Sequence, residues 1–199
     1  MISLKTFARY IIEKCFDIVY KRNVAKYIAG MCQDQNTALD IGVGTGFLSK
    51  QINIYHPSLK ITGIDIDDKT GGDHPVIIYD GNKIPFPDNS FDVVYCIDVL
   101  HHTKDILAVI KEIARVSKRY VIIKDHRIYS RFSFYMICFS DYITNAPYNI
   151  KCVYNFPNLE EWKFYFSEAD LELIEQPENL RYGFFLNERY NPIFKLSKK

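Results

Sequence analysis

The sequence lacks the features of a membrane or exported protein. None of its apolar stretches reaches the roughly eighteen residues that a transmembrane helix needs. Glu13 and Asp17 interrupt the apolar N-terminal stretch and no small-residue cleavage site follows it, unlike in a signal peptide. The formal net charge is only +1, which gives no overall attraction to nucleic acid. We therefore expect a cytoplasmic protein that binds no nucleic acid.

Paired cysteine motifs are also absent. The five cysteines are odd in number, scattered along the chain and never spaced as Cys-x-x-Cys. This pattern favours reduced thiols and supports neither a disulfide framework nor a zinc site. The cysteines are Cys15, Cys32, Cys96, Cys138 and Cys152.

Short apolar runs alternate with helical patterns along a chain that has no repeat or linker. Phe91–Ile97 is almost continuously apolar, which is typical of a parallel strand covered on both faces. Apolar residues at helical spacing over 106–116 predict a helix, which we expect Thr103 to cap. Similar spacing predicts two N-terminal helices, over 3–22 and 24–32. The other predicted elements are a helix over 47–55 and strands over 37–41, 60–64, 75–79, 120–124, 171–175 and 193–196.

Strands that alternate with helices across short connections indicate an α/β fold. We predict a Rossmann-like, doubly wound and mostly parallel sheet of seven strands, with helices on both faces. The last two strands would form a hairpin at one edge and supply an antiparallel edge strand.

Polar or glycine residues follow four of the predicted strands. Ligands of open parallel sheets bind outside the carboxyl ends of the strands, so these residues are candidates for a site. The glycines let the backbone turn sharply and let a ligand lie directly on the main chain. A tight turn without a ligand is the alternative. The residues are Asp40-x-Gly42-x-Gly44-x-Gly46, Asp65, Asp80 and Asp98.

A dinucleotide site is the main competitor for the glycine segment. Its fingerprint is Gly-x-Gly-x-x-Gly, whereas here the third glycine comes one residue early and Phe47 follows it. Asp40 beside the loop would repel a pyrophosphate and suits a ligand that carries an ammonium and a sulfonium group. The spacing therefore disfavours NAD.

The segment ALDIGVGTGFLS resembles the first motif of the class I S-adenosylmethionine-dependent methyltransferases. GIDID and YDGNKIPFPDNSFDVVYCIDVLHHT resemble the following motifs of their "type 11" small-molecule group, so that the resemblance covers residues 37–125. It implies S-adenosyl-L-methionine as the cofactor. Gly42, Gly44 and Gly46 would form the floor under its methionine part, with Asp40 near the amino group.

The same resemblance implies residues for the nucleoside part of the cofactor. Asp65 would accept hydrogen bonds from both ribose hydroxyls, and Ile66 would flank the adenine. Asp80 would accept from the adenine amino group, with the Gly81 backbone beside it. One departure is that the family's helix before Asp80 is replaced here by a short segment with two glycines and a proline. The residues that would lie along the cofactor are Cys96 and Ile97.

Histidines follow the fourth and fifth predicted strands, on the rim above the methyl donor. Histidine titrates near neutrality and can take a proton from an attacking hydroxyl or amine. His126, and after it His101 or His102, are therefore the candidate catalytic bases. Positioning without a dedicated base is the alternative, because in-line approach alone lowers much of the barrier. We expect no metal site, since these histidines lack the spacing of a facial ligand set.

Aromatic residues are abundant, with 15 Tyr and 14 Phe, and many follow residue 128. A helix over 130–143 and the loop behind it would give an aromatic-walled cavity for a planar or lipophilic acceptor. Asn145-Ala146-Pro147-Tyr148 resembles a motif of nucleic-acid methylases, but it lies far downstream of the fourth strand and we interpret it as a loop. Lysines and arginines of the N-terminal helix are expected to be solvated; contact with an anionic membrane surface is the alternative.

Residues 1–199 are thus predicted to form one methyltransferase domain that methylates a small-molecule acceptor, with oxygen favoured over nitrogen and carbon. A non-catalytic adenosylmethionine-binding partner subunit and an NAD(P)-dependent reductase are the alternatives. The sequence does not indicate an oligomeric state. The predicted parts are an N-terminal helical lid (1–35), a cofactor-binding core (37–125), a substrate-cover insert (126–165) and the final strands (170–197).

Overall fold

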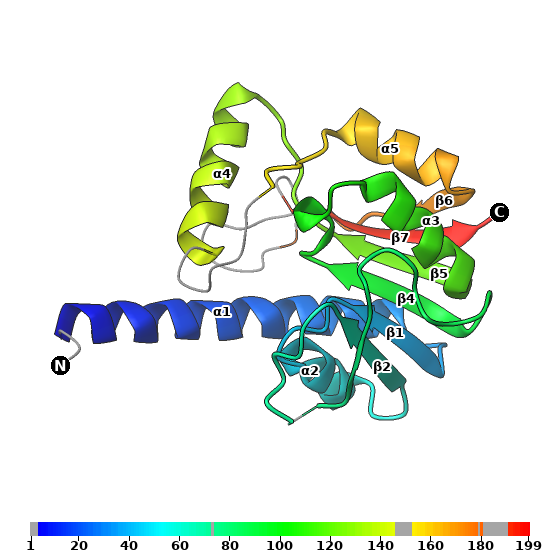
Figure 1. The fold of residues 1–199 in the computed structure, drawn as a ribbon, viewed down its shortest axis with the longest axis horizontal. Coiled ribbons are helices and arrows are strands. Elements are labelled where there is room, and N and C mark those ends of the chain that lie inside the picture. Colours follow the sequence, from blue (N-terminus) through cyan, green and yellow to red (C-terminus); the bar gives the residue numbers. More distant parts are fainter. Residues whose placement is uncertain (1–3, 73, 146–152, 179, 181–190) are drawn as a thin grey trace.

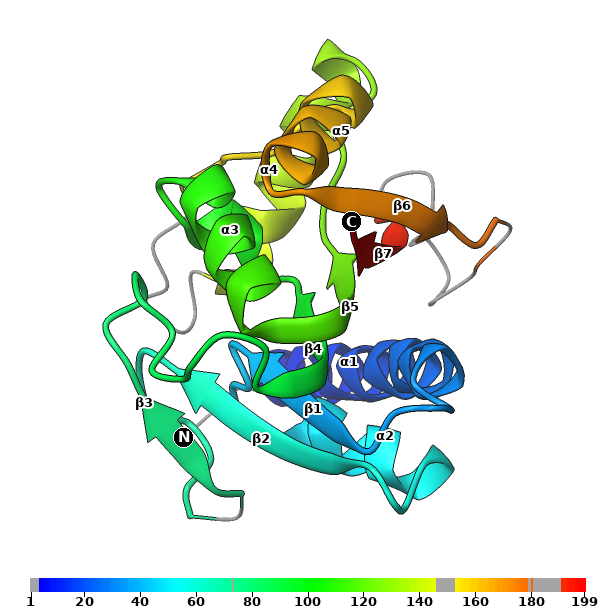
Figure 2. The same ribbon diagram turned by 90° about the vertical axis from the view of Figure 1, so that its right-hand side faces the viewer.

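The computed structural model describes residues 4–72, 74–145, 153–178, 180 and 191–199, with side chains from residue 18 onward except 140 and 143–145. It contains a seven-stranded sheet between two layers of helices (Figures 1 and 2). The strand order is β3-β2-β1-β4-β5-β7-β6. The strands are β1 (Thr37–Ile41), β2 (Lys60–Asp65), β3 (Val76–Ile78), β4 (Phe91–Ile97), β5 (Ser117–Lys124), β6 (Leu171–Glu175) and β7 (Ile193–Lys198).

All neighbouring strands pair in parallel except at β7, which is antiparallel to both β5 and β6. The predicted α/β fold, its seven strands and the hairpin at one edge are therefore confirmed. The strand order reverses between β1 and β4, so the carboxyl ends of these strands form the switch point where open sheets bind ligands.

Two helices cover each face of the sheet. Helices α1 (Leu4–Met31) and α2 (Phe47–Tyr55) lie on one face, and α3 (Ile106–Val116) and α5 (Leu159–Glu168) lie on the other (Figure 2). A short 3-10 helix, η1 (Leu100–His102), follows β4, and α4 (Arg131–Asn145) stands apart from both layers. Figure 1 shows that α4 and the N-terminal half of α1 both extend past the carboxyl ends of the parallel strands.

The sheet separates two hydrophobic clusters. One joins α3 and α5 to the sheet, and Trp162 lies at its centre with no exposed surface, stacked on Phe166. The other joins α1 and α2 to the opposite face through residues such as Ile28 and Ile52. Because β1 and β4 are covered on both sides, consecutive residues in them are apolar, which explains the continuous run in Phe91–Ile97.

Two predicted boundaries near the helices were wrong. The two expected N-terminal helices are one continuous helix, α1, because no glycine or proline interrupts 20–25 and Val24 and Ala25 pack on the sheet. Thr103 does not cap α3: the cap is Asp105, whose side chain accepts a hydrogen bond from the Ala108 N–H at 2.9 Å.

The fifth strand also begins earlier than predicted. Ser117 ends α3 and starts β5 in a single step, so the strand begins three residues before the predicted position. In this added part of the strand, Ser117 pairs with Phe91 of β4.

A buried polar cluster ties β1, α2 and β4 together beneath the glycine segment. The Ser49 hydroxyl of α2 donates to Asp40 Oδ2 at 2.5 Å and lies 2.8 Å from the Tyr95 hydroxyl. All three side chains are buried, and burial raises the pKa of Asp40 to about 7. The first turn of α2 is thereby fastened to the end of β1, which fixes both ends of the loop between them.

No helix within the described ranges is long and apolar enough to cross a membrane.

We predict that Asp40→Asn changes how stability depends on pH. Between its ordinary pKa of 3.8 and about 7, Asp40 is protonated in the folded chain and ionised in the unfolded chain, so its contribution to stability falls as pH rises. The free energy of unfolding of the variant, relative to the parent, should rise by about 2.5 kcal/mol from pH 5 to pH 8. Urea unfolding at both pH values measures this.

The exposed carboxylate of Asp67 provides the control, because Asp67→Asn should leave the parent's pH profile unchanged. If Asp40→Asn and the parent differed by the same free energy at both pH values, the buried cluster would not hold the proton that we assign to it.

Candidate functional site

The glycine loop between β1 and α2 forms the floor of the site. A Cβ atom at Gly42 would come within 2.3 Å of Val99, and one at Gly46 within 2.5 Å of His74, so both glycines are needed for packing. Gly44 differs, because a Cβ there would meet only the Gly42 carbonyl oxygen, at 3.9 Å. The backbone at Gly44 therefore faces open space, where a ligand can lie directly on the main chain.

Asp65, the last residue of β2, faces this loop. Its Oδ2 accepts a hydrogen bond from the Gly44 N–H at 2.8 Å, and its Oδ1 accepts one from the Ile66 N–H at 2.7 Å. A carboxylate has about four acceptor positions, so one on each oxygen remains for a ligand. A pair of neighbouring hydroxyl groups is the natural partner of such a carboxylate.

The residues predicted to surround the adenine lie in the loops beyond Asp65. β2 and β3 pair side by side, so the segments that follow them leave the sheet together. Ile66 is 64% exposed and lies beside Gly81, where a Cβ would come within 3.2 Å of it. The Asp80 side chain accepts hydrogen bonds from the backbone N–H groups of Asn82 and Lys83, which lower its pKa. The described part of 66–75 contains no helix, as the sequence predicted.

Two predicted residues at the end of β4 are less accessible. Cys96 is fully buried in the cluster beneath α3, and burial raises the pKa of its thiol well above the ordinary value. Only its backbone is therefore available to a ligand. Ile97 is partly buried and packs against the cluster on the α1 side.

An ion pair at the carboxyl ends of β4 and β5 was not predicted. Lys124, with no exposed surface, contacts Asp98 Oδ1 at 2.5 Å. The Tyr20 hydroxyl of α1 donates to Asp98 Oδ2 at 2.6 Å and is also contacted by the Lys124 ammonium group. Burial alone would raise the pKa of Asp98, but Lys124 and His126 hold it below its usual range. The sequence places Asp98 at a strand end but gives no signal for a partner from α1.

The His101 ring lies between two carboxylates. Its Nδ1 lies 2.6 Å from Asp125 Oδ1, its Nε2 lies 3.6 Å from Asp141 Oδ1, and the ring is 3% exposed. Burial by itself would lower the pKa of His101, but the charge and hydrogen bond of Asp125, together with Asp141, raise it to about 10. His101 therefore holds a proton near neutrality and is the poorer candidate for a base.

His102 and His126 surround the same point. The ring centres of His102 and His126 lie 4.0 and 4.8 Å from that of His101. Within the described residues, Nδ1 of each is buried without a hydrogen-bond partner. Burial and the neighbouring His101 lower the pKa of both, for His126 to about 4, so both rings are neutral near pH 7. The structure thus brings together the three histidines that the sequence singled out.

The aromatic residues behind His126 divide into two groups. Phe156 and Trp162 are buried, and Phe156 contacts the rings of His101 and His126 at 5.6 and 5.3 Å between centres. Several side chains of α4 are instead exposed, and Tyr135 lines an open hollow of about 670 Å³. The motif Asn145–Tyr148 lies almost wholly outside the described residues. The exposed aromatic residues of α4 are Phe132 (75%), Tyr135 (69%), Phe139 (63%) and Tyr142 (58%).

Comparison with known proteins shows what the cofactor-binding part of the chain is similar to. A family model described as a methyltransferase domain (Methyltransf_11) matches residues 39–123. Malonyl-[acyl-carrier protein] O-methyltransferase of Legionella pneumophila is 32% identical over 88 residues, which are 39% of this chain and 31% of that protein. Demethylmenaquinone methyltransferase of Thermotoga maritima is 29% identical over 110 residues, 52% of this chain and 47% of that protein. The chain thus spans less than half the length of these curated relatives.

Solved structures share the whole fold. A possible histamine N-methyltransferase of Thermotoga maritima superposes with a TM-score of 0.65 at 18% identity, over 97% of this chain and 98% of that one. Magnesium protoporphyrin IX methyltransferase of Synechocystis, solved with bound S-adenosylhomocysteine, gives a TM-score of 0.64 at 14% identity, over 91% of this chain and 84% of that one. These likenesses concern the fold alone.

The glycine loop opposite Asp65 and the strand order with antiparallel β7 agree with the match to the methyltransferase family model. Residues 39–123 therefore resemble a methyltransferase domain, and this likeness supports S-adenosylmethionine as the cofactor.

Proposed function

We propose that the chain transfers the methyl group of S-adenosylmethionine to a small aromatic or lipophilic acceptor, with oxygen as the favoured atom. The observation that carries this proposal is the open backbone surface at Gly44, with the Asp65 carboxylate on one side of it. The histidines after β4 and β5 lie at the same edge of the sheet, because parallel strands end together there.

The residues around the loop fit the cofactor. Gly44 offers room for the methionine part, and the free acceptor positions of Asp65 suit the two ribose hydroxyls. Exposed Ile66 offers an apolar surface for the adenine, with Asp80 beyond it. Asp40 lies under α2 with its Oδ2 bonded to Ser49, so we assign it first to fixing the loop, and the predicted contact with the amino group comes second.

The chemistry divides between the cofactor and the chain. Bound S-adenosylmethionine supplies an electrophilic methyl group on a sulfonium. The chain has to orient the acceptor in line with that group and exclude water, which can account for much of the rate enhancement. A hydroxyl acceptor also loses a proton as it attacks, and we assign its removal to His126. Both nitrogens of His101 face carboxylates, which makes His101 less suited to this step.

Several observations favour a bulky apolar acceptor. Helix α4, which carries exposed aromatic side chains, lies beyond the carboxyl ends of the parallel strands, the edge at which the glycine loop follows β1. An apolar wall of this kind suits planar or lipophilic molecules. The curated relatives are named for different acceptors. They include a 27-O-demethylrifamycin SV methyltransferase and sterol 24-C-methyltransferases. Both oxygen and carbon acceptors therefore belong in the test.

The test is a methyl-transfer assay with S-adenosylmethionine labelled in its methyl group. Phenols, quinols, lipophilic carboxylic acids and aromatic amines are offered in turn, and the labelled product is extracted. Label in an acceptor, absent with Asp65→Ala, would support the proposal. Tight binding of S-adenosylhomocysteine with no transfer to any class of acceptor would instead favour a non-catalytic binding subunit, and binding of NAD(P) alone would favour a reductase.

We predict that Gly44→Ala lowers cofactor affinity without loss of the fold. The new Cβ has room in the chain itself and costs only about 1 kcal/mol for its left-handed backbone conformation, φ 54°. It projects into the space assigned to the cofactor, so the affinity for S-adenosylhomocysteine should fall at least about tenfold, by about 1.4 kcal/mol or more. Isothermal titration calorimetry measures the change.

Gly71→Ala is the matched control for this variant. Gly71 also has a positive φ, 62°, and nothing within 4 Å of an added Cβ, so the backbone penalty is the same. Its affinity for S-adenosylhomocysteine should equal that of the parent. If Gly44→Ala and Gly71→Ala had equal affinities for S-adenosylhomocysteine, the cofactor would not lie on the backbone at Gly44.

We predict a larger loss of affinity for Asp65→Ala, because two charge-assisted hydrogen bonds to the ribose disappear. A loss of about 2–4 kcal/mol corresponds to a roughly 30- to 1,000-fold weaker affinity for S-adenosylhomocysteine. Asp67→Ala, in the same loop and exposed, should bind as the parent does. Circular dichroism checks that both variants are folded. An unchanged affinity of folded Asp65→Ala would show that the ribose lies elsewhere.

A further inference from the structure

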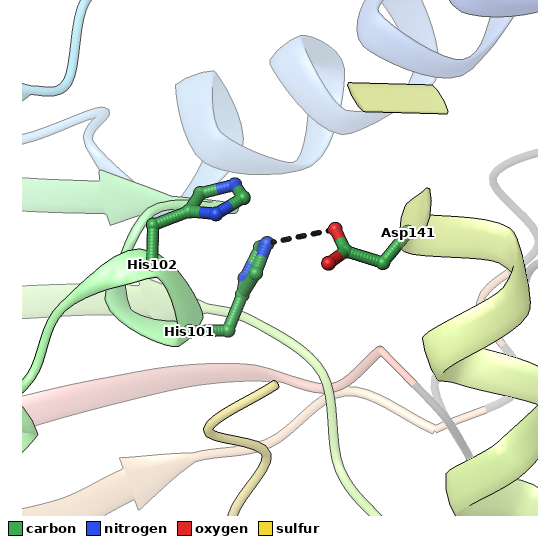
Figure 3. A group of neighbouring side chains, drawn as sticks. All are labelled: His101, His102 and Asp141. Carbon is green, nitrogen blue, oxygen red and sulfur yellow. Dashed lines mark ion pairs between the residues drawn. The ribbon is translucent and has the colours of Figure 1, made fainter. Parts of the chain in front are cut away.

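Three metal-ligating side chains converge beside the proposed methyl-transfer site. His101 and His102 come from η1 at the end of β4, and Asp141 projects toward them from α4 (Figure 3). One potential ligand atom from each of the three lies within 4.8 Å of the others. His101 and Asp141 are buried, with 3% and 4% of their surface exposed, and His102 is partly buried.

The orientation of His101 suits a metal ligand. Its Nδ1 faces Asp125 Oδ1 at 2.6 Å, which leaves Nε2 directed at Asp141 Oδ1. Metal-binding histidines usually donate their other ring N–H to a carboxylate in this way, which fixes the tautomer and orients the ring. The backbone N–H groups of His101 and His126 also donate to Asp125, so this carboxylate is held in place.

The distances leave room for an ion. His101 Nε2 and Asp141 Oδ1 are 3.6 Å apart, too far for a normal hydrogen bond. Two ligands of a tetrahedral zinc ion, each about 2.1 Å from the metal, are about 3.4 Å apart. The ligand atoms of all three residues lie within 4.8 Å of one another, which exceeds the distance between two ligands of a tetrahedral ion by little more than an ångström. A side-chain rotation can close roughly this difference.

The charges also favour a dication. Asp125 and Asp141 are both buried against His101, on opposite nitrogens of its ring. Buried carboxylates are suited to a cation that they coordinate, and two carboxylates balance the two positive charges of a divalent ion.

We propose that His101, His102 and Asp141 bind a divalent transition-metal ion of the zinc type, with Asp125 orienting His101. Two imidazole nitrogens and one carboxylate oxygen suit Zn²⁺ and its neighbours, and three protein ligands leave a coordination position open. The spacing of the histidines in the sequence does not indicate this site, because the carboxylate comes from α4, forty residues beyond His101.

The ion would fasten α4 to the sheet. Most of α4 is exposed and stands apart from the helical layers, and Asp141 is one of its few buried residues (Figure 1). A metal shared between η1 and α4 would fix the last turns of α4 over the site. This site is independent of the proposed function, since the cofactor residues are not among its ligands.

The test is equilibrium dialysis of the full chain against Zn²⁺ or Co²⁺, with the bound metal measured by mass spectrometry. We expect one ion per chain, and Asp141→Asn and His102→Gln should each weaken binding by at least about tenfold. His74→Gln is the control: His74 also has a buried ring nitrogen without a hydrogen-bond partner among the described residues, but it lies beside Gly46. That variant should bind the metal as the parent does.

Hydrogen exchange of the backbone provides a second readout. Zn²⁺ should slow exchange in 131–142 of the parent and leave Asp141→Asn unchanged. The proposal is overturned if the parent binds no ion stoichiometrically, if Asp141→Asn binds as tightly as the parent, or if binding is lost instead in Cys138→Ser, whose thiol lies one turn before Asp141. Affinity for S-adenosylhomocysteine, measured in parallel, separates these outcomes from a failure of the proposed function.

Discussion

The hydrogen bond from the Gly44 N–H to Asp65 is the interaction on which the arrangement of the site depends. It joins the loop after β1 to the end of β2, and it places an anionic acceptor beside the one glycine of this loop whose backbone faces open space. The buried contact of Asp40 with Ser49 fixes the same loop from below, through the first turn of α2. The loop is thus held before any ligand arrives, which reduces the ordering cost of binding.

The sheet and its ligand-binding loops could be predicted from the sequence because their signals are local. Continuous apolar runs identify strands such as Phe91–Ile97, and the glycine and acidic residues after them mark the strand ends. Predicted boundaries were wrong where local signals compete. Thr103 and Asp105 are both good capping residues, but the Thr103 hydroxyl donates to the Leu100 carbonyl oxygen of η1, and Asp105 caps α3. The fusion of the N-terminal helices into α1 depends on burial of Val24 against the sheet.

Contacts between distant segments could not be predicted from these local signals. Tyr20 reaches Asp98 from α1, and Asp141 reaches His101 from α4, and neither partnership leaves a trace in the spacing of residues. These contacts also change chemistry. A histidine that looks like a base in the sequence acquires two carboxylate neighbours, while His126, beside it in the chain of ring contacts, stays neutral. The protonation states at the rim are therefore a product of the fold.

The ion pair of Asp98 with Lys124 has a consequence for the position of α1. Because the Tyr20 hydroxyl completes this pair, moving α1 away from the sheet would remove a hydrogen bond from Asp98 and a contact from the fully buried Lys124 ammonium group. Helix α1 is therefore a fixed wall of the site.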